Sequence, residues 1–130
     1  QPMPSLPVAL GMRVALPSGS FTSRACSLED VAHTQEPCVE FIDVQKSGTR
    51  WKLRPWRSGD RFRPVNGGIE KKLSDLFADL HIPRERKHRI PILEGDGGII
   101  WICGIRLDDR FKVTAESAAV ARIEYTQEIE

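Results

Sequence analysis

The chain has 130 residues, of which 40% are hydrophobic and 28% are charged, and its formal net charge at pH 7 is +1. This length suits one domain or two very small ones, and the apolar content excludes intrinsic disorder as the main state. A membrane span is also excluded, because the longest apolar run, at 99–105, has seven residues and a span needs about 20.

The N-terminal part of the chain predicts a β-hairpin. Residues 11–16 and 20–26 are its two strands, and Pro-Ser-Gly at 17–19 supplies the turn. A polar stretch follows, in which Ser27 and Asp30 are candidate caps of one short helical turn.

A second hairpin is predicted next. Residues 38–44 alternate between apolar and polar types as a strand does, and 46–48 form a turn. Residues 49–56 are expected to be the partner strand, with Trp51, Leu53 and Pro55 on one face. The first third of the chain therefore predicts a small antiparallel β unit.

An amphipathic helix is predicted over 71–80. Its apolar residues are spaced at i, i+3, i+4 and i+7, and they are Leu73, Leu76, Phe77 and Leu80. Lys71 and Lys72 would lie at its start, where the helix dipole disfavours cations unless they face an anion. Pro83 suits the first position of a second short helix over 84–88.

The C-terminal third predicts mostly strands. Residues 89–93 enter a strand, and 94–98 are a tight turn. The apolar run at 99–105 predicts a central strand that is buried on both faces. Residues 111–113 suit a short strand, while 117–125 fit either a helix or a strand, of which we favour the strand.

The charge is distributed unevenly along the chain. The net formal charge is −2 over residues 1–49, +7 over 50–90 and −4 over 91–130. A basic segment therefore lies between acidic flanks, although the net charge of the whole chain is close to zero. Such a segment attracts phosphate.

The first basic segment is 53–64, where four arginines alternate with two aromatic residues. We expect a hairpin with its turn at 58–60, in which Arg61 and Arg63 share one face and Phe62 takes the other. The arginine fork suits phosphate and also stacks on rings. This segment therefore predicts contacts to a nucleic-acid backbone.

The second basic segment is 84–89, in which five of six positions are basic if His88 is counted. Alternatives remain open for both segments: the arginines of the first could pair with Asp60 or Glu70, and the second could be a solvated helix face. Because the segments flank one amphipathic helix, we expect them to form one phosphate-binding surface. Its predicted contact residues are Arg54, Arg57, Arg61, Arg63, Lys71, Lys72, Arg84, Arg86, Lys87 and Arg89.

Signals for catalysis are poor. The chain has no Gly-x-Ser-x-Gly, no Gly-rich loop with Lys-Ser/Thr and no His-Glu-x-x-His. The carboxylate pair Asp108–Asp109 is bracketed by Arg106 and Arg110, which predicts a salt-bridged turn. We therefore predict no catalytic residue.

The cysteines argue against a disulfide framework. Cys26, Cys38 and Cys103 are odd in number and widely spaced, which fits a reducing compartment. A metal hydrolase site of Cys26, His33 and Cys38 is a further alternative, but this spacing matches no standard zinc site. The chain begins with Gln1 and no basic leader, and we expect it to be a piece of a longer protein.

Six blocks of sequence occur in one consistent order over residues 50–115. They are Leu-Arg-Pro-Trp-Arg-Ser-Gly-Asp-Arg-Phe-Arg-Pro at 53–64, Lys-Lys-Leu-Ser-Asp-Leu-Phe at 71–77, Ile-Pro-Arg at 82–84, Arg-Ile-Pro at 89–91, Gly-Asp-Gly at 95–97 and Val-Thr at 113–114. Together they resemble the C-terminal domain of tRNA(Ile)-lysidine synthase, and residues 101–112 resemble the closing motif of that domain. Residues 1–49 carry no assigned motif and are expected to be either the β-rich lead-in of this domain or the end of an upstream domain. The tRNA-binding domain is expected at 50–130, with the whole chain forming one compact unit.

The resemblance implies an α+β domain, related to one in the phenylalanyl-tRNA synthetase β subunit. The whole enzyme would be a bacterial, cytoplasmic ligase that uses ATP to join lysine to the wobble cytidine of the CAU-anticodon isoleucine tRNA. ATP, with Mg²⁺, would belong to an N-terminal catalytic domain. The Ser-Gly-Gly-x-Asp-Ser loop of that domain is absent here, and the nearest fragment, 18–20, lacks the second glycine and the aspartate.

We therefore expect a chain that holds no cofactor or metal and binds the tRNA body and acceptor stem, with the catalytic domain as its other partner.

Two positions depart from the family. Residues 66–70 replace a Gly-Met-Lys-Gly-Ser-like turn, which removes a cation and adds Glu70, and His88 stands where the family is often acidic. Partial protonation of His88 would make binding mildly pH-dependent. The alternative function is a protein-binding module that docks an acidic domain surface or a second copy of the chain.

Overall fold

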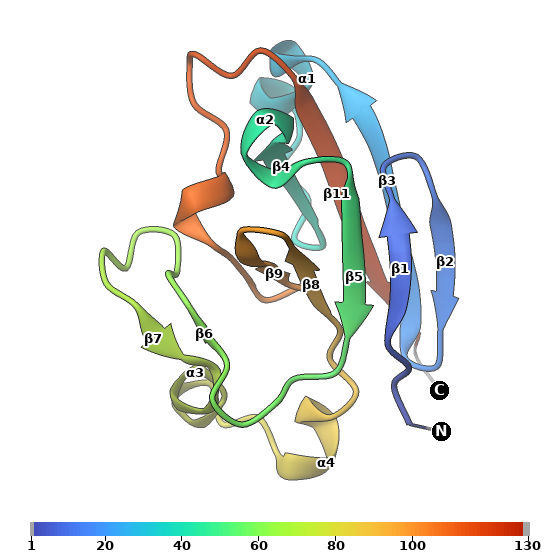
Figure 1. Cartoon of the computed structure of the whole chain (residues 1–130), viewed down its shortest axis with the longest axis vertical. Helices are drawn as coiled ribbons and strands as arrows, with labels where there is room; N and C mark the ends of the chain where they lie inside the picture. The colour runs from blue at the N-terminus through green and yellow to red at the C-terminus, as the bar shows by residue number, and fades with distance from the viewer. Residues whose placement is uncertain (1, 129–130) are drawn as a thin grey trace.

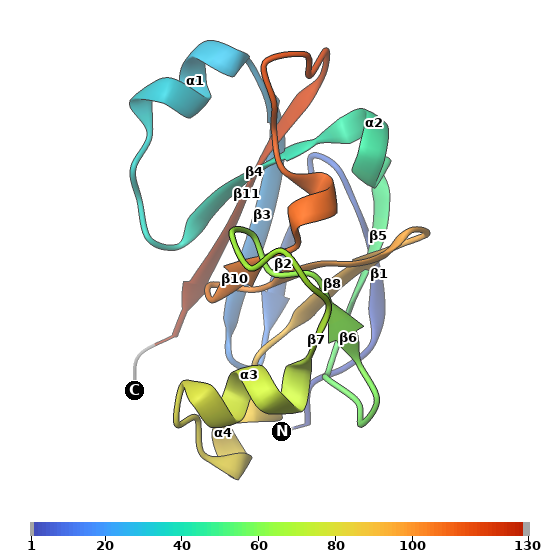
Figure 2. The same ribbon diagram turned by 90° about the vertical axis from the view of Figure 1, so that its left-hand side faces the viewer.

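Two antiparallel sheets and a layer of short helices are stacked in the chain (Figures 1 and 2). We describe them from a computed structural model, which describes residues 2–128. The first sheet has the strand order β1 (Leu6–Ala9), β5 (Arg50–Arg54), β8 (Ile92–Gly95), β9 (Gly98–Ile102) and β10 (Arg106–Leu107). The second has the order β2 (Arg13–Leu16), β3 (Gly19–Cys26), β11 (Val120–Gln127) and β4 (Val39–Asp43).

The remaining elements are short. A two-stranded ribbon consists of β6 (Arg61–Phe62) and β7 (Lys71–Lys72). The helices are α1 (Leu28–His33), α2 (Val44–Ser47), α3 (Leu73–Asp79), α4 (Arg84–Lys87) and the 3-10 turn η1 (Asp109–Phe111). No helix in the described part of the chain is long and apolar enough to cross a membrane. The predicted α+β class, with antiparallel sheets and a few short helices, is confirmed.

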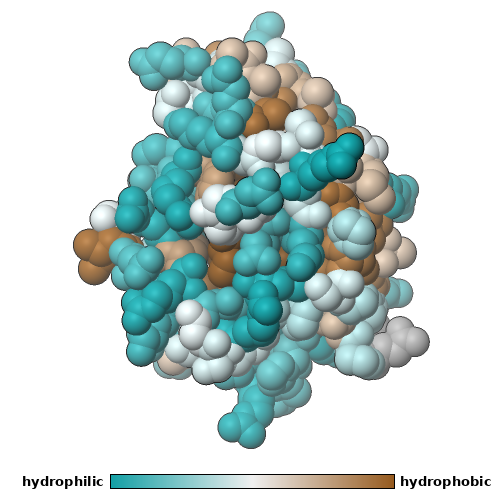
Figure 3. All heavy atoms as spheres, viewed as in Figure 1, coloured by the Kyte–Doolittle hydropathy of each residue, from teal (hydrophilic) through white to brown (hydrophobic). Residues whose placement is uncertain are grey.

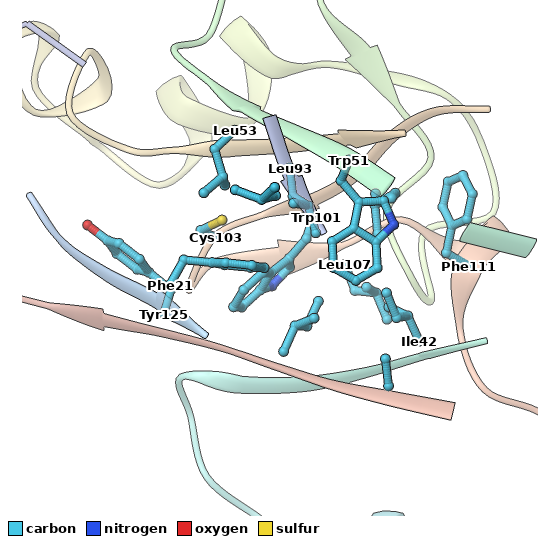
Figure 4. Packing of buried hydrophobic residues seen from close by; sticks show 14 of the residues in the cluster. Phe21, Ile42, Trp51, Leu53, Leu93, Trp101, Cys103, Leu107, Phe111 and Tyr125 are labelled. Carbon is cyan, nitrogen blue, oxygen red and sulfur yellow. The ribbon is translucent and has the colours of Figure 1, made fainter. Parts of the chain in front are cut away.

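The main core lies between the two sheets (Figure 4). Aromatic rings from both sheets fill it: Phe21 of the four-stranded sheet packs against Trp51 and Trp101 of the other, with ring centroids 6.5 and 6.4 Å apart. The predicted strand at 117–125 is confirmed as β11, and Ile123 on it is fully buried in this core. Burial of such large apolar side chains is the main force that holds the sheets together.

A second core lies on the other face of the five-stranded sheet. There α3 contributes Leu73, Leu76 and Phe77, which are the stripe that the sequence predicted. They pack with Phe62 of the ribbon and with residues of β8 and β9. Since Ile100 and Trp101 face the main core and Ile99 and Ile102 face the second, β9 is buried on both faces as predicted.

Local predictions in the N-terminal half are confirmed. The 13–16 and 19–26 strands pair as a hairpin, and Ser27 caps α1 through a capping box with Asp30. The turn before β9 is also confirmed, because β8 and β9 pair across it. Each of these features is decided by residues within a few positions of one another.

The predicted pairing of 38–44 with 49–56 is wrong. Each segment contains a strand, but β4 pairs with β11, whereas β5 pairs with β1 and β8. Between them Asp43 caps α2 by accepting a hydrogen bond from the Gln45 amide (2.9 Å), and Gly48 ends α2 with φ of 70°. The chain therefore passes from one sheet to the other where the sequence predicted a tight turn.

Four further predictions need correction. Lys71 and Lys72 precede the first residue of the helix and form β7, although Lys72 is the N-cap of α3 and still lies at the positive end of its dipole. The strand β6 pairs with β7 and not across the 58–60 turn. Pro83 is the cap of α4, one position before its first residue. The predicted strand at 111–113 is not formed: Phe111 is the last residue of η1, and Lys112 makes one isolated β-bridge, to Ile42.

The β3–β11 pairing leaves no room for a side chain at Gly19. A Cβ there would lie 2.1 Å from the Thr126 carbonyl oxygen on the neighbouring strand. We expect Gly19→Ala to lower the free energy of unfolding by about 2 kcal/mol, because backbone must move apart. Urea unfolding tests this, with Ser20→Ala as the control, which should change stability by less than about 0.5 kcal/mol. Equal stability of both variants would contradict the strand pairing.

Candidate nucleic-acid interface

The β6–β7 ribbon, with the residue that follows β6, carries four of the predicted contact residues. We call them the ribbon cations: Arg61, Arg63, Lys71 and Lys72. Arg61 lies opposite Lys72 in the register and both are exposed, while Phe62, between the two arginines, is buried. The alternation predicted for 61–63 is therefore confirmed. Arg61 donates to Glu70 (Nη1 to Oε2, 3.3 Å), and Lys71 pairs with Asp79 of α3.

The second group lies on and after α4, and we call it the α4 cations: Arg84, Arg86, Lys87 and Arg89. Both ribbon views place α3 between the ribbon and α4, on the lower side of the molecule (Figures 1 and 2). The two basic segments of the sequence thus lie in one layer, on either side of α3.

Trp56 joins this layer. Its ring meets Phe77 of α3 edge to face, with centroids 5.7 Å apart, and lies 6.0 Å from the His88 ring. The Lys87 ammonium sits 4.6 Å from the Trp56 ring centroid, which is a cation–π contact. Arg57 follows directly and its side chain is 64% exposed. The aromatic ring therefore holds the start of the first basic segment against the second.

Most of these cations are available to an external anion. Within residues 2–128 no carboxylate pairs with Arg63, Lys72, Arg84, Arg86 or Lys87. The Arg57 guanidinium comes only within 4.0 Å of Glu94, and the Arg61–Glu70 pair is about half exposed on both sides. Exposed pairs contribute at most about 1 kcal/mol, so a phosphate can replace the carboxylate.

Arg54 has a different role. The residue is 3% exposed and its guanidinium donates five hydrogen bonds, to Asp60, Glu94 and the Pro55 carbonyl, at 2.9–3.2 Å. Burial alone would lower the pKa of Arg54, but the two carboxylates outweigh it and the pKa is raised. The pairing with Asp60, one of the alternatives from the sequence, is present, and Arg54 is not part of the exposed surface.

The indole N–H of Trp56 is buried and has no hydrogen-bond partner. By contrast, the Trp51 indole donates to the carbonyls of Ser47 (3.1 Å) and Gly48 (3.2 Å). We expect Trp56→Phe to change the free energy of unfolding by less than about 1 kcal/mol, because the lost ring area is offset by removal of an unpaired donor. The matched Trp51→Phe should cost about 2 kcal/mol. Urea unfolding of both variants tests this, and a larger loss for Trp56→Phe would contradict it.

The other candidate sites of the sequence are structural. Asp108 is fully buried and accepts hydrogen bonds from the Arg63 amide (2.9 Å) and from Arg110, which confirms the salt-bridged turn. The described residues hold no group of three His, Cys, Asp or Glu placed to bind a metal, so Cys26 and His33 form no such site with Cys38.

A cavity of about 490 Å³ lies beside α4. Arg86 and Arg89 line it together with Glu85 and Glu128, so its charged groups are of both signs. Cys103 also lines it, and burial raises the pKa of that thiol well above its usual value. The presence of both positive and negative side chains distinguishes the cavity from the basic surface. Because its pKa is raised, the Cys103 thiol is not a reactive nucleophile.

A family model described as the TilS substrate C-terminal domain matches residues 51–125. The chain belongs to this family. The matched range contains both basic segments and all ten predicted contact residues. The resemblance seen in the sequence is thereby confirmed.

Curated relatives carry the name tRNA(Ile)-lysidine synthase. The one from Geobacter sulfurreducens is 37% identical over 81 residues, which are 62% of this chain and 17% of that protein. The one from Clostridium acetobutylicum is 34% identical over 90 residues, 69% of this chain and 20% of that protein. The part of each relative that this chain matches is therefore at most a fifth of that relative's length.

A solved structure shows the same fold. The crystal structure of a TilS C-terminal domain superposes with a TM-score of 0.80 at 21% sequence identity, and the alignment covers 98% of this chain and all of that one. The likeness extends beyond the 51–125 range, since residues of the first third supply β1 to the five-stranded sheet and β2–β4 to the other.

Two residues beside the β6–β7 ribbon were not among the predicted contact residues. Arg110 lies near Arg63, because the Asp108 carboxylate accepts hydrogen bonds from the Arg63 amide and from the Arg110 guanidinium, yet it is distant from both basic segments in sequence. Ile69 is 75% exposed at the loop between β6 and β7. The sequence does contain an indication that Ile69 is exposed: it stands among turn residues, where an apolar side chain has no local neighbour to pack against.

Proposed function

We propose that this chain is the tRNA-binding C-terminal domain of a tRNA(Ile)-lysidine synthase. In this proposal the ribbon cations, Arg57 and the α4 cations contact the sugar–phosphate backbone of the tRNA body and acceptor stem. The observation that carries the proposal is the junction at Trp56, which brings two separate basic segments into one layer. The family membership and the names of the relatives support it.

The kind of recognition follows from the residue types. Lysine and arginine side chains on short, exposed elements reach phosphates, and such contacts position a protein without reading sequence. An A-form helix offers phosphates and 2′-hydroxyls more readily than base edges, so the contact would be to shape and backbone. Arg54 is left out of the proposed contact set, because all its donors are used within the protein.

We propose that catalysis lies in another part of the enzyme, which would be a cytoplasmic, ATP-dependent ligase. Supporting this, the Ser18–Ser20 turn is a poor phosphate cradle: Gly19 is paired to Gln127 in the β3–β11 ladder, and Ser18 accepts from Tyr125. This turn therefore does not fit the phosphates of ATP. We propose also that residues 1–49 and 50–130 act as one unit, since β1 pairs with β5 and β3 with β11.

A competition experiment separates this function from the alternative of docking an acidic protein surface. The chain is bound to labelled CAU-anticodon isoleucine tRNA, and unlabelled tRNA or poly-glutamate of equal charge is added. We expect the tRNA to compete at much lower charge concentration than the polypeptide, because a rigid A-form helix loses less conformational entropy on binding than a flexible polypeptide does. Equal competition by the two polymers would favour the acidic-surface alternative.

A further inference from the structure

The loop at 66–70 projects an apolar side chain from the basic ribbon. Ile69 is 75% exposed, whereas the other exposed large hydrophobic residues of the described chain, Met12, Leu28 and Leu80, are 41–43% exposed. Over this loop a brown patch protrudes at the left edge of the molecule (Figure 3). An isolated, strongly exposed isoleucine gains free energy if a partner covers it.

The base of this loop is held by the rest of the fold. The Val65 amide donates to the Leu107 carbonyl (3.0 Å), and the Gly67 amide donates to the Pro64 carbonyl (2.9 Å). Pro64 also makes an isolated β-bridge to Asp108, the fully buried carboxylate. The tip is thus presented from an ordered base, which lowers the entropy lost on binding.

The charges around the tip select the partner. Arg61 and Lys72 lie on the two strands that flank the loop, and Arg63 directly follows β6. Glu70 is the one acidic side chain of the 66–70 loop, and Arg61 already binds it. An apolar tip that projects between such cationic strand ends is complementary to a polyanion that also has apolar surface.

We propose that Ile69 lies in the minor groove of an A-form RNA duplex, against the ribose faces, while Arg63 and Lys72 reach the phosphates on either side. This inference rests on the proposed tRNA-binding function and adds an apolar contact to it. The A-form minor groove is wide and shallow and displays riboses and 2′-hydroxyls, so a loop tip fits. The minor groove of B-form DNA is only about 6 Å wide and would not admit the tip and its flanks.

The test uses Ile69→Ser and a matched control, Leu28→Ser, on the distant helix α1. The whole chain is titrated with an acceptor-stem RNA minihelix, and with a DNA duplex of the same sequence, over a salt series. We expect Ile69→Ser to weaken RNA binding about tenfold, as loss of an apolar contact does, with an unchanged slope of log K against log salt, since no phosphate contact is lost. DNA binding, and RNA binding by Leu28→Ser, should match the wild type.

Three results would overturn the inference. If Ile69→Ser binds RNA as the wild type does, and the wild type binds in a salt-dependent way, then Ile69 makes no contact with the RNA. The proposed function would be unaffected by that result. A reduced salt slope would show that Ile69 acts by arranging the cations. Absence of RNA binding by the wild type would overturn both, and loss of self-association by Ile69→Ser in sedimentation would then assign the tip to a second copy. Urea unfolding confirms that both variants are folded.

Discussion

Replacement of Arg54 by alanine should destabilise the chain by about 3–5 kcal/mol, because it breaks a buried ion-pair network. The guanidinium lies between Asp60 and Glu94, at 3.0 and 3.1 Å. Its removal leaves the Asp60 carboxylate, whose side chain is 12% exposed, without its cation. The loss therefore comes mainly from stranded negative charge and not from lost packing.

Urea unfolding measures this effect, and two further variants test whether the loss of stability comes from the buried ion pairs. Arg57→Ala, at the neighbouring exposed arginine, should cost less than about 0.5 kcal/mol. Arg54→Met combined with Asp60→Asn and Glu94→Gln should recover most of the stability, because no buried charge is then left unpaired. A loss below about 1 kcal/mol for Arg54→Ala would contradict the structural role assigned to this arginine.

Reversal of three α4 cations should remove most RNA binding. In the variant Arg84→Glu, Arg86→Glu, Lys87→Glu, three proposed phosphate contacts become repulsive. We expect at least about a hundredfold weaker binding to tRNA at about 50 mM salt, and a slope of log K against log salt that is smaller by about three. The fold should survive, since α4 has no buried residue.

A control triple variant carries the same change in net charge at another place. Arg13, Arg24 and Lys46 are exposed and lie on β2, β3 and α2, away from α3 and α4 (Figure 1). Their reversal to glutamate should weaken binding only a few-fold through long-range repulsion, with an unchanged slope. Equal losses for the two triple variants would mean that net charge, and not a defined surface, governs binding.

Short-range patterns in the sequence predicted the local elements well. The helix stripe of Leu73, Leu76 and Phe77 and the capping box at Ser27 depend on residues within one or two turns, so periodicity and side-chain chemistry suffice. The alternation of Arg61, Phe62 and Arg63 was predicted for the same reason, because the period of a strand is two.

Long-range partners could not be predicted in this way. Two strands adjacent in sequence usually pair, yet β4 and β5 belong to different sheets, and only the distant β1, β8 and β11 decide this. The same holds for Arg54, whose partner Glu94 is 40 residues away. A guanidinium that binds phosphate and one that binds two buried carboxylates look alike in sequence, so the predicted contact set included a structural arginine.

The salt dependence of binding to an acceptor-stem minihelix tests the central proposal most directly. Titrations of the wild-type chain and the two triple variants at about 50 mM and 200 mM salt give the slopes. The proposal predicts tight, salt-dependent binding by the wild type and the control variant, with a slope near −4 if about five phosphates are contacted, and a much smaller slope for the α4 variant. Absence of binding by the wild type at low salt, or one slope shared by all three chains, would contradict it.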